Sequence, residues 1–160
     1  MAYGELGNYK KMLSYLESTL AIEEKAYAPD HPEIATSLYA IGMAYGKLGE
    51  YNKEIAYCEK SLKIREKAYK PNHPKVATAL YAVGVAWGKT GQYKKKLEYC
   101  ERALAVNEKT YAPNHPKVAT ALYAVGMAYG GLGNYKQSLS YLEKSLEIRE
   151  KVYAPDHPKI

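Results

Sequence analysis

Tyr27-Ala28-Pro29-Asp30-His31-Pro32 is a six-residue stretch that returns at 69–74, 111–116 and 153–158, each time 42 residues further along. The copies differ from it only at the second and fourth residues. A fixed period of this size is typical of stacked structural repeats rather than of one globular core. Two prolines three residues apart prevent a single helix from running through the stretch. The sequence therefore predicts an array of helical units joined by these turns, with function on a surface that the units build jointly.

The first half of each 42-residue unit predicts a helix, as the residues after His73 illustrate. Pro74 fits the first helical turn, where its missing N–H costs no hydrogen bond. Asn72 or His73 is the expected N-cap, and asparagine is the better capping residue. Gly91 is expected to end the helix in the left-handed conformation. The same role is expected of Gly7, Gly49 and Gly133.

The second half of the unit predicts a second helix that carries one apolar stripe. That stripe consists of Tyr93, Leu97, Cys100, Leu104 and Tyr111. Each helix is expected to span about 17 to 20 residues, or roughly 25 to 30 Å. The predicted fold is all-α, a single array over residues 1–160 built of antiparallel helix pairs. The array is expected to begin with a partial repeat over 1–31, which contains the end of a first helix and a complete second helix. Three complete repeats are expected to follow, over 32–73, 74–115 and 116–157. Residues 158–160 are expected to start a further repeat.

Two glycines, four residues apart, recur within each complete first helix. Each costs about 1 kcal/mol of helix propensity relative to alanine, so a packing reason is expected. Gly84 lies on the buried stripe, which indicates close helix packing, whereas Gly88 points toward another face and is expected to open space in a groove. The other pairs are Gly42 with Gly46 and Gly126 with Gly130.

The two cysteines, Cys58 and Cys100, occupy the same position of consecutive units, where other copies carry leucine. A position that accepts leucine or cysteine is an apolar core position. Equivalent atoms of stacked helix pairs lie on the order of 10 Å apart, whereas a disulfide needs Cα atoms within about 7 Å. We therefore predict two buried free thiols and a reducing compartment, which points to a cytoplasmic protein.

The pattern over residues 80–104 resembles the tetratricopeptide repeat family. It comprises Leu80, Val83-Gly84, Trp87, Gly91, Tyr93 and Ala103-Leu104. The longer period, the His-Pro at each helix start and the segments at 62–67 and 146–151 are similar to kinesin light chain-type repeats. The resemblance covers the whole chain and implies a right-handed α-solenoid, the tetratricopeptide superhelix, with the first helices on its concave side.

The resemblance also implies a peptide-binding groove lined by the inward positions of the first helices. Carried onto this sequence, those positions are Thr36, Tyr39, Met43 and Lys47, then Thr78, Tyr81, Val85 and Lys89, then Thr120, Tyr123 and Met127, with Gly131 in place of the third lysine. Members of the family usually carry two asparagines where this chain has Tyr-Ala, and a small residue early in the second helix. Here that second position carries Met12, Glu54, Lys96 and Ser138 and looks loosely specified.

The predicted function is a non-catalytic scaffold that binds a peptide or partner segment with apolar anchors, with or without acidic residues beyond them. A carboxylate clamp of the kind some family members use is not expected, because tyrosine and methionine occupy its positions. Two alternatives stay open. The chain could self-associate through uncapped terminal helices, or bind nucleic acid through Lys94 to Lys96, the densest basic run.

Other functions are not expected from the sequence. The four histidines recur one per unit, too far apart to share a metal ion, and turn chemistry explains them. Gly88-Lys89-Thr90 lacks the first glycine and the preceding strand of a phosphate-binding loop. No catalytic arrangement stands out, so neither an enzyme nor a cofactor is predicted. The long uncharged stretch 118–135 contains four glycines, and no membrane span or signal peptide is expected.

Overall fold

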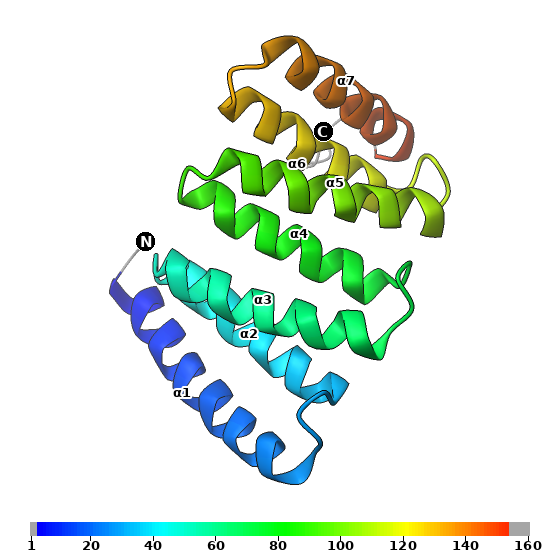
Figure 1. Ribbon diagram of the computed structural model, residues 1–160. Helices are drawn as coiled ribbons and strands as arrows, with labels where there is room; N and C mark the ends of the chain where they lie inside the picture. The colour runs from blue at the N-terminus through cyan, green and yellow to red at the C-terminus, as the bar shows by residue number, and fades with distance from the viewer. Residues whose placement is uncertain (1–2, 154–160) are drawn as a thin grey trace. The chain divides into compact units, whose positions relative to one another are not determined.

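The computed structural model describes residues 3–153, and the side chains of residues 7–153. The described chain forms helices only, as predicted, and Figure 1 shows their order. The helices are α1 (Tyr3–Ala26), α2 (Pro32–Lys47), α3 (Tyr51–Ala68), α4 (Pro74–Lys89), α5 (Tyr93–Thr110), α6 (Pro116–Gly131) and α7 (Tyr135–Val152). The expected repeat start at 158–160, together with His157, lies outside the described residues.

Two compact units divide the chain, Met1–Lys70 with α1 to α3 (unit 1) and Pro71–Ile160 with α4 to α7 (unit 2). The predicted pairs are α2 with α3 in unit 1, and α4 with α5 and α6 with α7 in unit 2. Helix α1 packs on α2, and α5 packs on α6. The antiparallel helix pair is therefore confirmed as the building block, while the exact repeat boundaries stay a prediction.

Glycine ends each complete first helix as expected. Gly49, Gly91 and Gly133 have φ values of 79°, 77° and 78°, in the left-handed region that glycine adopts without steric cost. Gly7 does not follow them, because it lies inside the continuous helix α1. Continued helical hydrogen bonding through Gly7 prevails there over the expected turn.

The N-caps of the first helices are histidines, which corrects the preference for the preceding asparagine. The backbone N–H groups of Glu33, Lys75 and Lys117 donate to Nδ1 of the three histidines at 3.3, 3.1 and 3.1 Å. The histidines are His31, His73 and His115. The reason is the proline that follows each of them. A residue before proline is held in the extended region, and an N-cap needs that conformation.

Buried glycines and cysteines bring the two helices of a pair close together. A Cβ on Gly42 would lie 2.8 Å from Cys58 Sγ, and one on Gly84 would lie 2.7 Å from Cys100 Sγ. Both cysteines are buried and free, as predicted. Burial raises the pKa of Cys100 to about 11, so its thiol stays protonated and unreactive at neutral pH.

Among the described helices, none combines the length and the hydropathy needed to cross a bilayer.

Replacing a capping histidine should destabilise the fold by the value of a lost N-cap. We expect His115→Ala to lower the free energy of unfolding by about 1 kcal/mol, because the Lys117 N–H loses its acceptor. His115→Asn restores a side-chain acceptor and should keep most of that stability. Urea unfolding of both variants near neutral pH measures the difference. Equal losses in the two variants would show that the cap is not the reason for the histidine.

Candidate partner-binding face

The predicted groove positions all remain accessible on the first helices. On α2, Thr36 and Lys47 are exposed while Tyr39 and Met43 are half-buried. On α4, Lys89 is exposed and the other three positions are half-buried. On α6, Thr120, Tyr123 and Met127 are exposed. The α2 positions belong to unit 1 and those of α4 and α6 to unit 2, so a surface built by two first helices is described in unit 2 only.

The threonines of this face are engaged in their own helices. Each hydroxyl donates to the carbonyl oxygen of the proline four residues earlier, at 3.0 to 3.1 Å. The residues concerned are Thr36, Thr78 and Thr120. Their hydroxyl protons are already used, so these side chains are left to offer a partner an acceptor oxygen and a methyl group.

Arginines from the second helices pack over two of the predicted tyrosines. The Arg65 guanidinium carbon lies 5.0 Å from the ring centre of Tyr39, and that of Arg149 lies 5.1 Å from the ring centre of Tyr123. Burial raises the pKa of Tyr39 and lowers that of Arg65. Tyr81 packs against the core of unit 2 instead. The tyrosines therefore support neighbouring side chains, and Tyr123, which is 42% exposed, is the most open of the three.

A hollow of about 360 Å³ lies on this face of unit 2, between α4 and α6 (the α4–α6 hollow). It contains three of the predicted site residues, namely Val85, Lys89 and Met127. The other five lining residues are Gly88, Tyr93, Lys96, Gly130 and Gly131. The sequence analysis placed Gly131 at an inward position and expected Gly88 to open space in a groove, but it did not assign Tyr93, Lys96 or Gly130 to the site. The recurring glycine pairs were the available signal, because they indicated open space on this side of the helix.

Gly88 makes room for Lys96, a residue whose position looked loosely specified in the sequence. A Cβ on Gly88 would lie 2.6 Å from Lys96 Cδ and 3.4 Å from Nζ, so the lysine stem runs across the glycine. The corresponding residues of the other pairs show that this position is in fact well defined. Glu54 is buried against Gly46, and Ser138 is buried against Gly130. The second glycine of each first helix therefore accommodates the side chain that faces it.

The absence of a third lysine at Gly131 also has a steric reason. A Cβ at this position would overlap the ring of Tyr93. The ring of Tyr93 thus lies where a side chain on α6 would begin, and it forms part of the hollow. As a result, the cationic groups of the α4–α6 hollow come from α4 and α5 and not from α6.

The densest basic run does not form one patch. Lys96 crosses Gly88 into the α4–α6 hollow, whereas Lys95 Nζ lies 3.6 Å from the ring centre of Trp87. Successive helical residues point about 100° apart, so Lys94 faces another direction again. A nucleic-acid backbone would therefore not meet the three ammonium groups together, and this alternative gains no support from the geometry.

A family model described as tetratricopeptide repeat matches residues 1–57 and 88–151. The matched residues make up well over half of the chain. The chain belongs to the tetratricopeptide repeat family. Proteins with these repeats are generally non-catalytic scaffolds for protein–protein interaction. No curated protein matches the chain.

Solved tetratricopeptide structures share the fold of this chain. Nearly identical TPR-like repeats of a putative kinesin light chain from Podosopora anserina are 24% identical, with a TM-score of 0.84, and the match covers 98% of this chain and 74% of that one. BtubC (BKLC) from P. vanneervenii is 18% identical over 94% of this chain and 61% of its own, with a TM-score of 0.82. The apo form of RapI is 19% identical over 93% and 52%, with a TM-score of 0.79. At these identities the likeness establishes the kinesin light chain-like repeat fold and nothing finer.

Tyrosines near the end of two first helices connect neighbouring repeats inside each unit. The Tyr45 hydroxyl donates to Glu17 Oε1 at 2.9 Å, and the Tyr129 hydroxyl donates to Glu101 Oε1 at 3.0 Å. Burial, followed by the bond to Glu17, raises the pKa of Tyr45 to about 12. The bond to Glu101 is the main cause that raises the pKa of Tyr129. These bonds give the buried Tyr45 ring and the half-buried Tyr129 ring the hydroxyl partners that such rings need.

The raised pKa of Tyr45 predicts a specific loss of stability in alkali. Because the folded-state pKa of about 12 lies above the ordinary value of about 10, the neutral phenol stabilises the fold below pH ~10. That contribution is lost as the pH rises from about 10 to about 12. We expect the free energy of unfolding of Tyr45→Phe to fall less steeply over this range than that of the unmodified protein. Urea unfolding at a series of alkaline pH values measures both slopes.

The control is Tyr135→Phe, which removes a phenol that is 74% exposed. Its slope should match that of the unmodified protein. Parallel slopes for all three proteins would contradict the role assigned to Tyr45.

Proposed function

We propose that the chain is a non-catalytic scaffold and that the α4–α6 hollow of unit 2 binds an extended segment of a partner protein. The observation that carries the proposal is the composition of the hollow, where the Val85 and Met127 side chains lie together with the cationic Lys96. An apolar side chain of the partner would fill the space against valine and methionine. A carboxylate next to it would approach the Lys96 ammonium.

The physical properties of these three side chains suit such a segment. Methionine is flexible and polarizable, so it adapts to anchors of different shape. Lys96 lies across Gly88, and its stem is held there by packing while its charge faces the hollow. A held ammonium loses less side-chain entropy on binding than a free surface lysine would. The hollow therefore favours an acidic residue beside a leucine-like anchor.

Selection from a random peptide library on the immobilised protein tests this proposal directly. We expect enriched peptides to carry aspartate or glutamate next to an apolar residue, and their affinity to fall as salt rises. Lys96→Ser copies the residue that unit 2 already carries at Ser138, so it should preserve the fold. It should weaken the selected peptides about two- to fivefold, the value of one lost charge pair near a protein surface.

Met127 provides the second variant and its matched control. Met127→Glu places a negative charge in the hollow and should abolish binding, whereas Met127→Val copies the Val85 environment and should retain it. Selected peptides that bind all of these variants equally would refute the α4–α6 hollow as the site. In that case the scaffold function would have to reside on another face.

Self-association through α7 is a second candidate function. Four large apolar residues of this helix are exposed, namely Tyr135, Leu139, Leu146 and Val152, at 74%, 59%, 44% and 42%. The first three form the row considered as an interface. Their counterparts on α5 are partly or fully buried, and these are Tyr93, Leu97 and Leu104. A row of exposed apolar side chains on one helix is typical of an interaction surface. A second copy of α7 would cover it by symmetric packing.

Sedimentation velocity over a range of protein concentrations tests this second candidate. We expect a concentration-dependent dimer that Leu139→Glu reduces to a monomer, because the new charge would be buried in the interface. Ser140→Glu adds the same charge at an exposed position beside the row and should leave the dimer intact. A protein that sediments as a monomer at high concentration would exclude the dimer.

A further inference from the structure

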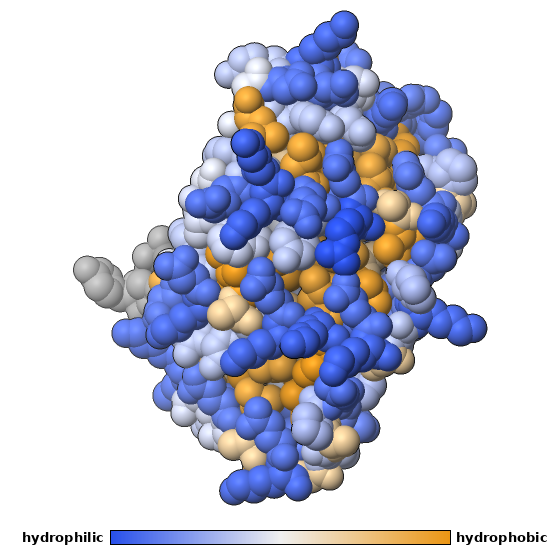
Figure 2. Space-filling model, in the orientation of Figure 1, coloured by the Kyte–Doolittle hydropathy of each residue, from blue (hydrophilic) through white to orange (hydrophobic). Residues whose placement is uncertain are grey.

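Unit 1 contains another hollow, which differs from the α4–α6 hollow because none of the predicted groove positions lines it. It measures about 660 Å³ and is bounded by α1, the link that follows α1, α2 and α3 (the α1–α3 hollow). In Figure 2 the lower part of the view shows orange apolar atoms between blue side chains, over the space between α1 and α3. The volume falls in the range of about 300 to 1,000 Å³ that is usual for small-molecule sites.

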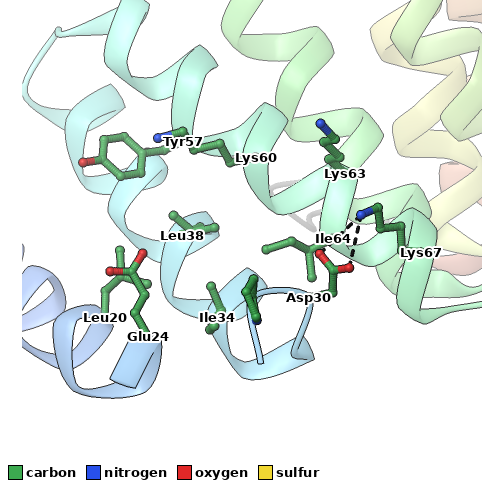
Figure 3. Close-up of a pocket in the computed structure, with 11 residues that line it drawn as sticks. Leu20, Glu24, Asp30, Ile34, Leu38, Tyr57, Lys60, Lys63, Ile64 and Lys67 are labelled. Atoms are coloured by element: carbon green, nitrogen blue, oxygen red, sulfur yellow. Dashed lines mark hydrogen bonds and ion pairs between the residues drawn. The ribbon is translucent and has the colours of Figure 1, made fainter. Parts of the chain in front are cut away.

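The floor of the α1–α3 hollow is aliphatic and its wall is aromatic. Four buried side chains form the floor, and these are Leu20, Ile34, Leu38 and Ile64. Figure 3 shows them beneath Tyr57, whose ring stands at one side. An apolar ligand body placed here would displace water from surface that the fold leaves partly uncovered.

The rim of the hollow is cationic along α3. Lys60 Nζ lies 5.4 Å from the ring centre of Tyr57, and Lys67 Nζ binds the two Asp30 carboxylate oxygens at 3.1 and 3.4 Å (Figure 3). Lys63 stands between them on the same helix face. Its ammonium group has no ion-pair or hydrogen-bond partner among residues 7–153. A charged group available beside an apolar floor is what an amphipathic anion requires.

Unit 2 contains the same hollow with a different rim, at positions 84 residues further along. It measures about 550 Å³ and lies between α5 and α7 (the α5–α7 hollow). Leu104, Val118, Leu122 and Ile148 line it.

Two substitutions change the charge of the α5–α7 rim. Glu147 replaces Lys63 and Asn114 replaces Asp30. Lys151, the counterpart of Lys67, is held by Glu147 at 2.6 Å along the helix. The shape is thus shared by the two hollows, while the charge at one rim position is reversed from lysine in the first to glutamate in the second.

We propose that the α1–α3 hollow binds a small amphipathic carboxylate, an alkyl or aryl body that ends in one carboxylate group. The apolar body lies on the aliphatic floor against Tyr57, and the carboxylate pairs with Lys63 and Lys60. A head group with several negative charges is disfavoured, because Glu24 and Asp30 also line the hollow. The α5–α7 hollow does not bind the same ligand, since Glu147 stands where the carboxylate would lie. This site is separate from the α4–α6 hollow and does not depend on the function proposed for it.

Methyl NMR of the full chain, labelled at isoleucine, tests the proposal with octanoate as the probe. The isoleucine methyl groups report the two hollows separately, through Ile34 and Ile64 in one and Ile148 in the other. We expect octanoate to shift the first two signals saturably and to leave Ile148 unchanged. Octylammonium and 1-octanol carry the same chain without the negative charge, and they should bind more weakly, by about two- to fivefold for the neutral 1-octanol.

A reciprocal exchange of rim residues provides the matched variants. Lys63→Glu gives the α1–α3 hollow the rim residue of its counterpart and should weaken octanoate about five- to tenfold. Glu147→Lys makes the opposite change and should cause Ile148 to respond to octanoate. Both side chains are exposed, so the urea-unfolding midpoints of the variants should stay close to that of the unmodified protein.

Three results would overturn the proposal. One is equal binding of octanol and octanoate, which would mean that the rim charge plays no part. Another is an equal response of Ile148 and Ile64 in the unmodified protein, which would mean that Glu147 does not discriminate. The third is saturable binding of an acetylated Leu-Glu dipeptide amide at Ile64 when octanoate does not bind, which would assign the hollow to a protein partner instead.

Discussion

The contact on which each helix pair depends is the close approach of its two helices at a glycine. Gly42 and Gly84 come so near to a cysteine of the facing helix that any side chain would overlap the sulfur. Each glycine costs about 1 kcal/mol of helix propensity, and the burial of the facing apolar side chains offsets that cost. Once this contact is made, the second glycine of the first helix, which lies four residues later, faces a residue of the second helix. That residue lies one helical turn before the cysteine. The residue at that position then decides what reaches the surface.

The same backbone therefore carries different chemistry from one pair to the next. Opposite the second glycine stand a buried glutamate in α3, a lysine in α5 and a serine in α7, which are Glu54, Lys96 and Ser138. Only the lysine is long enough to cross its glycine and place a charge in a hollow. The rims of the α1–α3 and α5–α7 hollows differ in the same way, since Lys63 and Glu147 occupy equivalent exposed positions. Within each unit, the packing of the helix pairs thus repeats, whereas the side chains at these few positions differ and change the chemistry of the surface.

Much of the fold could be predicted from the sequence because local rules determine it. The 42-residue period, the left-handed glycines and the buried thiols depend on residue type and spacing alone. The histidine was one of the two expected caps, but it was ranked below asparagine because a general ranking of capping residues leaves out the conformational effect of the next proline. Gly7 was misjudged because a glycine at this spacing can also be accommodated inside a continuous helix, as it is in α1.

The candidate sites were predicted less completely than the fold. Val85, Lys89 and Met127, which line the α4–α6 hollow, were among the positions predicted from the resemblance, because a helical face can be read from spacing. Lys96 was not found, since its role depends on a glycine in the facing helix that only the packed pair brings near. The lysine rim on α3 was likewise invisible in the sequence, where a solvated charge run looks the same as a ligand site.

The exposure of the rim residues explains how their charge can be reversed without loss of the fold. The Lys67 and Asp30 side chains are 56% and 58% exposed, and ion pairs this open contribute about 0 to 1 kcal/mol. The buried leucines and isoleucines beneath them contribute on the order of 1.5 to 3 kcal/mol each. Stability therefore resides in the floor of each hollow, and the ligand preference proposed for the α1–α3 hollow would reside in its rim. A substitution such as lysine to glutamate at position 63 or its reverse at 147 changes what the hollow attracts, while the packing that forms the hollow is left as it was.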